Sequence, residues 1–302
     1  MATAPRIPVR REWIGAPAGT LANPTVGLLV AALATFGISA WAYEEQSLPV
    51  PAIVALQVVA LYVIFTPLHE AMHGVAHRSD AVNEWIGRVS GAVLTISLPL
   101  FRAVHYEHHS HTNDPARDPD HVVATRPRWL LPLWSAAIVL VYRRHFYGRR
   151  LWRSAGDHRE SVGYDAALVA LFVAAVLTGH GRALVVLWLG PALLAVLVLG
   201  IAFDFVPHFP YDSTARYHDT RIYGGAALNA VLLGQNQHLI HHLWTTIPWF
   251  RYRGVVREIG TELAARGCRI GWRITPLPAP LDDAVHARAS LPTAPVSEAH
   301  PG

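Results

Sequence analysis

Apolar segments of the chain alternate with short turns that are charged or contain Gly and Pro. Four segments are predicted to cross a membrane as helices, at residues 25–43, 52–68, 164–178 and 183–205. An acidic turn at 44–46 joins the first two, and a turn at 179–182 joins the last two, so each pair forms a hairpin. The pattern predicts an all-α integral membrane protein with about four transmembrane helices in two hairpins.

Two further apolar segments, 86–101 and 129–142, are shorter and contain Gly or Pro. We expect re-entrant or interfacial helices there, because a spanning helix needs about 20 apolar residues. The basic stretch 143–150 follows the second segment and is expected to face the cytoplasm, as Arg-rich short loops do. With an even number of spans, both termini are then expected on the cytoplasmic side.

Composition supports a membrane protein, since 52% of the 302 residues are hydrophobic and 15% are charged, against about 25% in soluble domains. The single cysteine, Cys268, excludes an internal disulfide and a Cys-based metal site within the chain. All the basic residues are arginines that flank apolar segments, which favours a role in topology over nucleic-acid binding. We expect a cytoplasmic arm at 1–23, a membrane domain at 24–278 and a disordered tail at 279–302.

Histidine is concentrated in three segments: 69–77 (HEAMHGVAH), 105–109 (HYEHH) and 238–242 (HLIHH). Residues four apart share a helix face, so His69 and His73 would aim at one point, while His77 is expected beside the site. In each HxxHH segment the first two histidines lie about one turn apart, and the third points elsewhere, where it can bind a second metal. Eight histidines exceed the three or four ligands that one ion needs, which predicts a two-metal site of iron, copper or zinc.

A fourth polar element, DFVPH, follows the last predicted span at 204–208. Its position on the same membrane side predicts that His208 is a ninth ligand and that Asp204, one turn earlier, orients an imidazole. His111 is left outside the predicted ligand set. Five further histidines without a partner at ligand spacing are predicted to be ordinary solvated or hydrogen-bonding side chains: His121, His145, His158, His180 and His218.

Other interpretations remain possible for these segments. His69-Glu70-x-x-His73 also satisfies the zinc-protease pattern, with Glu70 as general base, but a protease would leave the other two segments unexplained. A purely structural role would bury unpaired imidazoles at a membrane boundary, which is costly. A metal carrier without catalytic activity is a further alternative.

Five blocks of the sequence resemble the membrane di-iron superfamily of fatty-acid desaturases and hydroxylases, and bacterial β-carotene hydroxylases in particular. They are HEAMHGVAHR, VHYEHH, NDPARDPDH, DFVPH and LGQNQHLIHHLWTTIPWFRY, within about residues 50 to 275. The family has Asp after the first histidine where this chain has Glu70, a change that keeps the charge. The resemblance implies a bacterial inner-membrane protein with a cytoplasmic His-rich cap that holds two irons, and the implied ligands are His69, His73, His105, His108, His109, His208, His238, His241 and His242.

The chemistry implied by the resemblance is O₂ activation and removal of hydrogen from an unactivated C–H bond, giving an alcohol or an alkene. We expect a monooxygenase that hydroxylates an apolar membrane-dissolved substrate, such as the ring of β-carotene or a related carotenoid; a fatty-acyl lipid desaturase or hydroxylase is the alternative. His77, Glu70 and Asp204 are expected beside the ligands, and no other catalytic residue is predicted. Electrons are expected from a separate ferredoxin-like protein. Trp244, Trp249 and Phe250 are predicted to form an interfacial aromatic belt, or else to line the substrate entrance.

Overall fold

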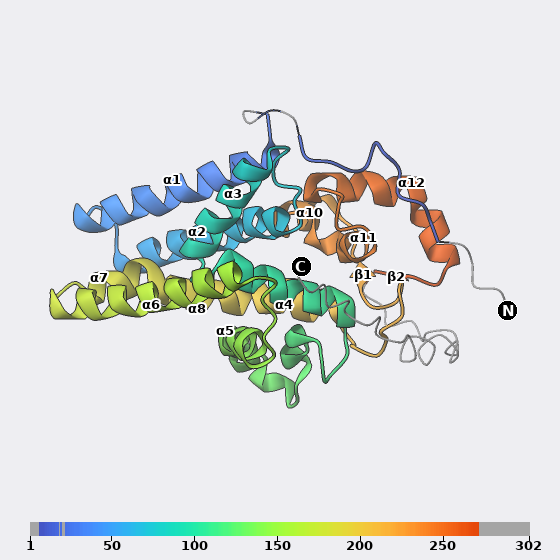
Figure 1. The fold of residues 1–302 in the computed structure, drawn as a ribbon. Coiled ribbons are helices and arrows are strands. Elements are labelled where there is room, and N and C mark those ends of the chain that lie inside the picture. The colour runs from blue at the N-terminus through green and yellow to red at the C-terminus, as the bar shows by residue number, and fades with distance from the viewer. Residues whose placement is uncertain (1–5, 18, 20–21, 272–302) are drawn as a thin grey trace, which may run out of the picture.

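The computed structural model describes residues 6–17, 19 and 22–271, so the predicted tail at 279–302 lies outside the described residues. Helices extend from one end of the molecule, and a cap of shorter elements lies at the other end (Figure 1). Within the described residues, four helices are long and apolar enough to span a membrane: Pro24–Glu44, Val50–Met72, Ala155–Leu177 and Gly181–His208. The predicted all-α membrane fold is confirmed.

The first two spans are α1 (Pro24–Glu44) and α2 (Val50–Met72), the third is α6 (Ala155–Leu177), and the fourth is a run of consecutive segments. These segments are α7 (Gly181–Leu184), the π-helical η3 (Val185–Leu189), α8 (Gly190–Leu199), the π-helical η4 (Gly200–Phe205) and α9 (Val206–His208). Helix α6 begins earlier than the predicted 164, because Ser154 and Asp157 form a capping box ahead of the apolar stretch. Hydropathy alone does not detect this polar first part.

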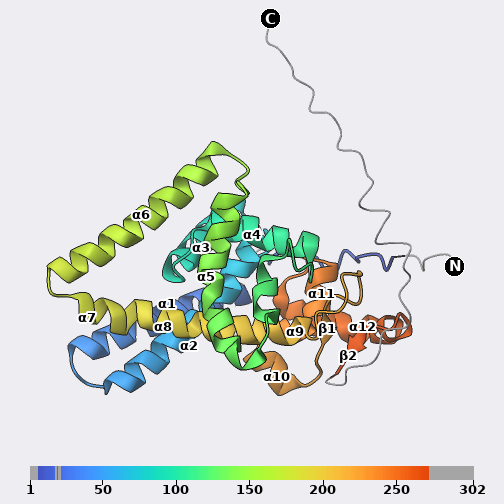
Figure 2. The same ribbon diagram turned by 90° about the horizontal axis from the view of Figure 1, so that it is seen from below.

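The apolar segment predicted at 86–101 is divided between two helices, α3 (Asp80–Val93) and α4 (Leu98–His111), which meet at 94°. A Cβ on Gly91 would lie 2.6 Å from the carbonyl oxygen of Ile96, so this tight bend needs glycine there. Helix α5 (Leu131–Gly148) contains most of the segment predicted at 129–142 and runs across α8 rather than along it (Figure 2). Within the described residues, α5 does not qualify as a membrane-spanning helix, which agrees with the predicted interfacial position.

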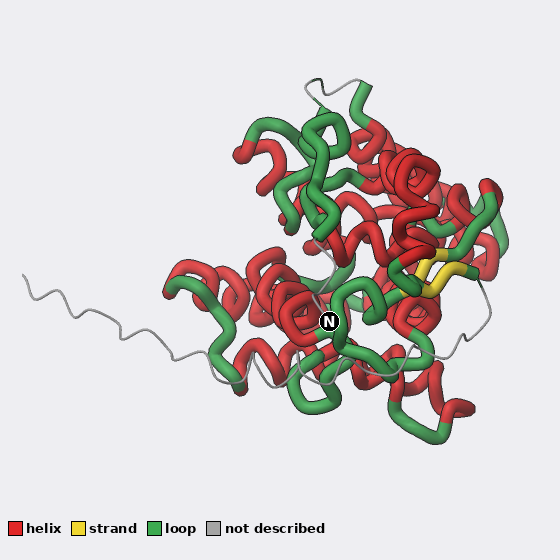
Figure 3. Tube along the Cα trace, turned by 90° about the vertical axis from the view of Figure 1, so that its right-hand side faces the viewer, coloured by secondary structure: helices red, strands yellow, loops and turns green. Residues whose placement is uncertain are grey.

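The cap follows the fourth span, and two short 3₁₀ turns, η1 (Pro119–Ala124) and η2 (Arg128–Leu130), precede α5. The helical elements of the cap are α10 (Ala226–Val231), η5 (Gln235–Gln237), α11 (His238–Leu243), η6 (Trp249–Arg251) and α12 (Tyr252–Ala265). Strands β1 (Arg221–Ile222) and β2 (Arg269–Ile270) pair in parallel within the cap (Figure 3).

The N-terminal arm packs into the cap. Trp13 is only 4% exposed, its ring lies 5.6 Å from that of Trp244, and its Nε1–H donates to Glu258 at 2.7 Å. Arg251 donates to the carbonyl oxygen of Ile14 at 2.7 Å. Trp244 therefore belongs to the core of the cap, which corrects its predicted place in an aromatic belt or at a substrate entrance.

Candidate metal centre

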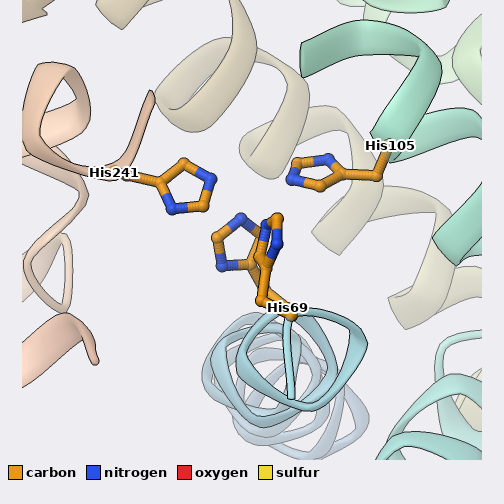
Figure 4. Close-up of side chains that lie close together, drawn as sticks. His69, His105 and His241 are labelled. Carbon is orange, nitrogen blue, oxygen red and sulfur yellow. The ribbon is translucent and has the colours of Figure 1, made fainter. Parts of the chain in front are cut away.

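The predicted ligand histidines converge where the ends of the spans meet the cap. A first group, which we call cluster A, comprises His69 and His73 at the end of α2, His105 on α4 and His241 on α11. One ring nitrogen from each lies within 4.8 Å of the others. His69, His105 and His241 point toward one another from three separate elements (Figure 4).

A second group, cluster B, comprises His108, His208, His238 and His242, and their ring nitrogens also lie within 4.8 Å of one another. His208 ends the fourth span, and its ring lies 4.8 Å from that of His108 and 5.0 Å from that of His238. The residue that sequence reasoning added as a ninth member is thus placed among the others.

His109 lies between the two clusters. Its Nε2 is 3.0 Å from Nε2 of His105 and 2.9 Å from Nε2 of His241, both in cluster A. Its ring is 4.4 Å from that of His242 in cluster B. All nine predicted ligand side chains therefore gather at one place.

The structure divides the HxxHH segments differently from the sequence expectation. His105 and His109, four residues apart, lie together near cluster A, and the middle histidine, His108, belongs to cluster B. The third segment is divided in the opposite sense, since His238 and His242 belong to cluster B, whereas His241 belongs to cluster A. On a helix with 3.6 residues per turn, positions four apart are closer in direction than positions three apart, so each segment contributes to both clusters.

Two carboxylates hold His108 in cluster B. Its Nδ1 lies 2.8 Å from Asp118 Oδ1 and 3.3 Å from Asp120 Oδ2. Asp118 is itself fixed, because it accepts the backbone N–H groups of Asn113 at 2.7 Å and of Asp120 at 2.9 Å. Such partners orient a ligating imidazole and raise its basicity. Sequence reasoning missed both carboxylates, although the block NDPARDPDH directly after the second histidine segment contains them.

In three other histidines, Nδ1 has a neutral partner. His238 Nδ1 lies 3.0 Å from Gln235 Oε1, His242 Nδ1 lies 3.4 Å from Thr112 Oγ1, and His241 Nδ1 lies 3.1 Å from the hydroxyl of Tyr252. Burial, reinforced by neighbouring imidazoles, lowers the pKa of His238, His241 and His242 well below the ordinary value. They are therefore neutral and can offer a lone pair to a metal.

Several buried ring nitrogens have no hydrogen-bond partner among the described residues. They are Nδ1 of His69 and both nitrogens of His73 and of His208. Leaving such polar atoms unsatisfied in the interior is costly, and a metal ion would satisfy one nitrogen of each ring. The orphaned nitrogens and the all-imidazole donor set therefore fit two transition-metal ions.

The three residues expected beside the ligands have different surroundings. Glu70 is buried, its Oε2 accepts the backbone N–H of Trp249 at 3.1 Å, and its Oε1 lies 3.9 Å from Nδ1 of His69. His77 lies outside both clusters and accepts the N–H of Ser79 at 3.0 Å. Asp204 lines a cavity next to the clusters.

That cavity lies between α2, the bend from α3 to α4, α5 and the fourth span. Phe65 and Phe101 form part of its wall, and they stack on His69 at 5.8 Å and on His105 at 5.4 Å between ring centres. The cavity is thus separated from cluster A by one layer of aromatic rings. Its remaining lining is mainly aliphatic: Leu68, Leu94, Thr95, Ile96, Ile138, Val139, Tyr142, Arg143, Val196, Leu199, Gly200 and Asp204.

Similarity to known proteins agrees with this architecture. The sn-1 oleoyl-lipid 12-desaturase of Arthrospira platensis is 24% identical over 250 residues, which cover 70% of each chain. The zeaxanthin 4-ketolase of Chlamydomonas reinhardtii is 25% identical over 196 residues, which cover 62% of this chain but only 39% of the ketolase. Residues 45–273, most of the protein, match the sequence model of the family described as fatty acid desaturase. The chain therefore belongs to the fatty acid desaturase family and is an integral membrane oxidoreductase.

Proposed function

We propose that this protein is a di-iron, O₂-dependent monooxygenase that hydroxylates an apolar substrate dissolved in the membrane, namely the ring of β-carotene or a related carotenoid. The observation that carries the proposal is the apolar cavity whose rings Phe65 and Phe101 stack on His69 and His105. The similarity to a zeaxanthin ketolase supports a carotenoid. The proposed location is the bacterial inner membrane, with the cap in the cytoplasm.

Clusters A and B would each hold one iron through four imidazoles, with His109 between them. When bound, the two irons would supply O₂ activation. One oxygen atom enters the C–H bond as a hydroxyl and the other leaves as water, which consumes two electrons and two protons. We propose that a separate ferredoxin-like protein delivers the electrons to the cytoplasmic face, where the exposed Arg144, Arg149 and Arg150 of the basic stretch 143–150 offer positive charge to an acidic partner.

The protein's own side chains orient the ligands and exclude water. Asp118 fixes the ring of His108, and the hydrogen bond from Trp249 to Glu70 ties the cap to the end of α2 beside His69. The aromatic layer keeps the cavity apolar up to the histidines. These contacts support a site in which a bound hydrocarbon is held near the metals without competing water.

A fatty-acyl lipid desaturase or hydroxylase is the second candidate. The lipid desaturase match covers 70% of both chains, a larger share than the ketolase match covers. The same site could remove two hydrogens from an acyl chain, and the cavity lining is as apolar as such a chain requires.

The geometry disfavours a zinc protease. In a protease of this pattern the glutamate must face the metal-bound water, but the Glu70 carboxylate accepts the backbone N–H of Trp249. His69 and His73 also share their cluster with His105 and His241, whereas the protease pattern needs only one further ligand.

The test is expression of the full chain in a host that produces β-carotene, with pigments and membrane lipids analysed from the same cells. We expect hydroxylated carotenoid whose new oxygen derives from O₂, and about two irons per purified chain. His241→Ala should abolish the product. Unchanged carotene together with altered acyl chains would overturn the carotenoid assignment in favour of the lipid one.

A further inference from the structure

A second hollow, separate from the cavity beside the clusters, opens where the N-terminal arm meets the cap. We call it the arm pocket. Its volume of about 520 Å³ lies within the roughly 300–1,000 Å³ range of small-molecule sites. Residues 14–17 of its lining come from the arm, Gly74, His77 and Arg78 from the loop after α2, and Arg251 from η6. A molecule bound there would contact three segments that are far apart in the sequence.

The arm pocket is positively charged. Arg78 and Arg251 line it, and its described lining contains no carboxylate. The acidic residues nearest to the lining along the chain, Glu12 and Asp80, do not belong to it. Two guanidinium groups without a counter-charge favour an anion, and the planar donor pairs of arginine match the oxygens of a phosphate group.

Both arginines keep hydrogen-bond donors for such a ligand. Within the described residues, the exposed guanidinium of Arg78 has neither a hydrogen bond nor an ion pair. Arg251 donates from Nη1 to the carbonyl oxygens of Trp13 at 3.2 Å and of Ile14 at 2.7 Å, and its Nε and Nη2 bond to no other described residue. The two carbonyls hold Arg251 in place beside the pocket, whereas Arg78 is free to turn toward a bound anion.

The arm pocket lies at the level where two membrane spans end. Helix α2 ends at Met72, just before Gly74. The side-chain amide of Asn23, the N-cap residue of α1, donates to the carbonyl oxygen of Ala76 at 2.7 Å and so ties the same loop to the first span. Lipid phosphates occupy this depth, and basic pockets beside the ends of spans bind the headgroups of anionic lipids.

We propose that the arm pocket binds a phosphate ester, namely the headgroup of an anionic phospholipid such as phosphatidylglycerol. The phosphate accepts hydrogen bonds from Arg78 and Arg251, and it therefore links the loop after α2 to η6 beside the arm. The bound lipid thus holds the arm on the cap. This site does not depend on the proposed reaction, because none of the histidines of clusters A and B lines the pocket.

The test measures lipid binding to the purified full-length protein in a nonionic detergent, by native mass spectrometry at increasing lipid concentration. Phosphatidylglycerol is compared with diacylglycerol of the same acyl chains, which lacks the phosphate group. We expect phosphatidylglycerol to bind at least about tenfold more tightly, as charge-assisted hydrogen bonds provide. Equal binding of the two lipids would overturn the proposal.

Three variants locate the binding. Arg78→Gln should weaken the binding of phosphatidylglycerol about tenfold, and Arg78→Lys, which keeps the charge but not the planar donor pair, should weaken it less. Arg257→Gln is the matched control, because Arg257 is exposed on α12 and lies outside the pocket. Equal weakening by Arg78→Gln and Arg257→Gln would show binding through diffuse surface charge and would also overturn the proposal.

A competition experiment separates a lipid from a soluble ligand. Glycerol 3-phosphate carries a phosphate ester without acyl chains, and it is added in excess to the protein loaded with phosphatidylglycerol. We expect the lipid to remain bound, because its acyl chains also contact the apolar spans. Complete displacement would overturn the lipid as the ligand and would assign the pocket to a soluble phosphate ester.

Tryptic cleavage at Arg11 reports whether the lipid holds the arm. A docked arm is cleaved only after it detaches locally, so phosphatidylglycerol should slow cleavage in the wild-type protein but not in Arg78→Gln. Cleavage at Arg117, exposed in a loop outside the pocket, is the control in the same digest and should not change. Unchanged cleavage at Arg11 with the lipid bound would overturn the link between lipid and arm.

Discussion

Cluster A and cluster B contain equal numbers of histidines but are positioned in different ways. In cluster A, His69 lies on a 23-residue span, with Phe65 stacked on its ring. In cluster B, His208 ends the fourth span, and two other histidines lie on the six-residue α11. In cluster B, Nδ1 is hydrogen-bonded in three of the four rings. In cluster A, it is hydrogen-bonded to a side chain in one ring, that of His241. Stacked aromatic rings orient His69 and His105 in the first cluster, whereas hydrogen bonds orient three of the four rings in the second.

Removal of one ligand from each cluster should have the largest effect. We expect His105→Ala and His238→Ala each to lose one metal per chain and to lower turnover by at least about 100-fold, since even partners of ligands cost 10- to 100-fold. Elemental analysis and product formation measure the two effects. His111→Ala is the control, because His111 lies outside both clusters and bonds the carbonyl oxygen of Glu107. Full metal content in either cluster variant would contradict the two-site division.

Loss of packing should affect cluster A through α2. Ile64 is 1% exposed on that helix and does not line the cavity, so Ile64→Ala should destabilise the protein by about 2 kcal/mol or more through lost packing contacts. Ile64→Val is the matched control and should cost about 1 kcal/mol. Thermal inactivation of the purified protein measures both. Equal effects of the two variants would show that packing around α2 is not critical.

Loss of a charged partner should affect cluster B selectively. Asp118→Asn removes the charge that faces Nδ1 of His108, and we expect metal affinity or activity to fall about 10- to 100-fold. Mössbauer spectra of the iron-loaded protein should show a change in one of two iron environments. Asp114→Asn, in the same loop but ion-paired with Arg117, should leave the spectra unchanged. A change in both environments would remove the distinction between the clusters.

Loss of a neutral partner in cluster A should have the smallest effect. Tyr252→Phe deletes the hydroxyl 3.1 Å from Nδ1 of His241, a contact worth about 1 kcal/mol, so metal affinity should fall less than tenfold. Competition with a chelator measures that affinity. A loss as large as that of Asp118→Asn would show that cluster A also depends on its polar contacts.

The sequence predicted the spans and the gathering of the nine histidines, because hydropathy and helical spacing are local properties. It did not predict that His108 and His241 each belong to a different cluster from the other histidines of their own segment. That division depends on how α4 and α11 face each other. The bend between α3 and α4 and the place of Trp244 beside Trp13 depend likewise on contacts between distant segments. Asp118 lay in a recognised block, but its direction toward His108 follows from a loop conformation.

The distribution of ligands along the chain also sets an order of events during biosynthesis. Each cluster combines α4 with α11, and α11 begins only at His238. Trp13 packs against Trp244 and donates to Glu258, which lies 245 residues further along the chain. Neither cluster can therefore assemble before α11 has been synthesised and has docked against α4. In the proposed di-iron enzyme, capture of the metals would therefore follow docking of the cap on the spans.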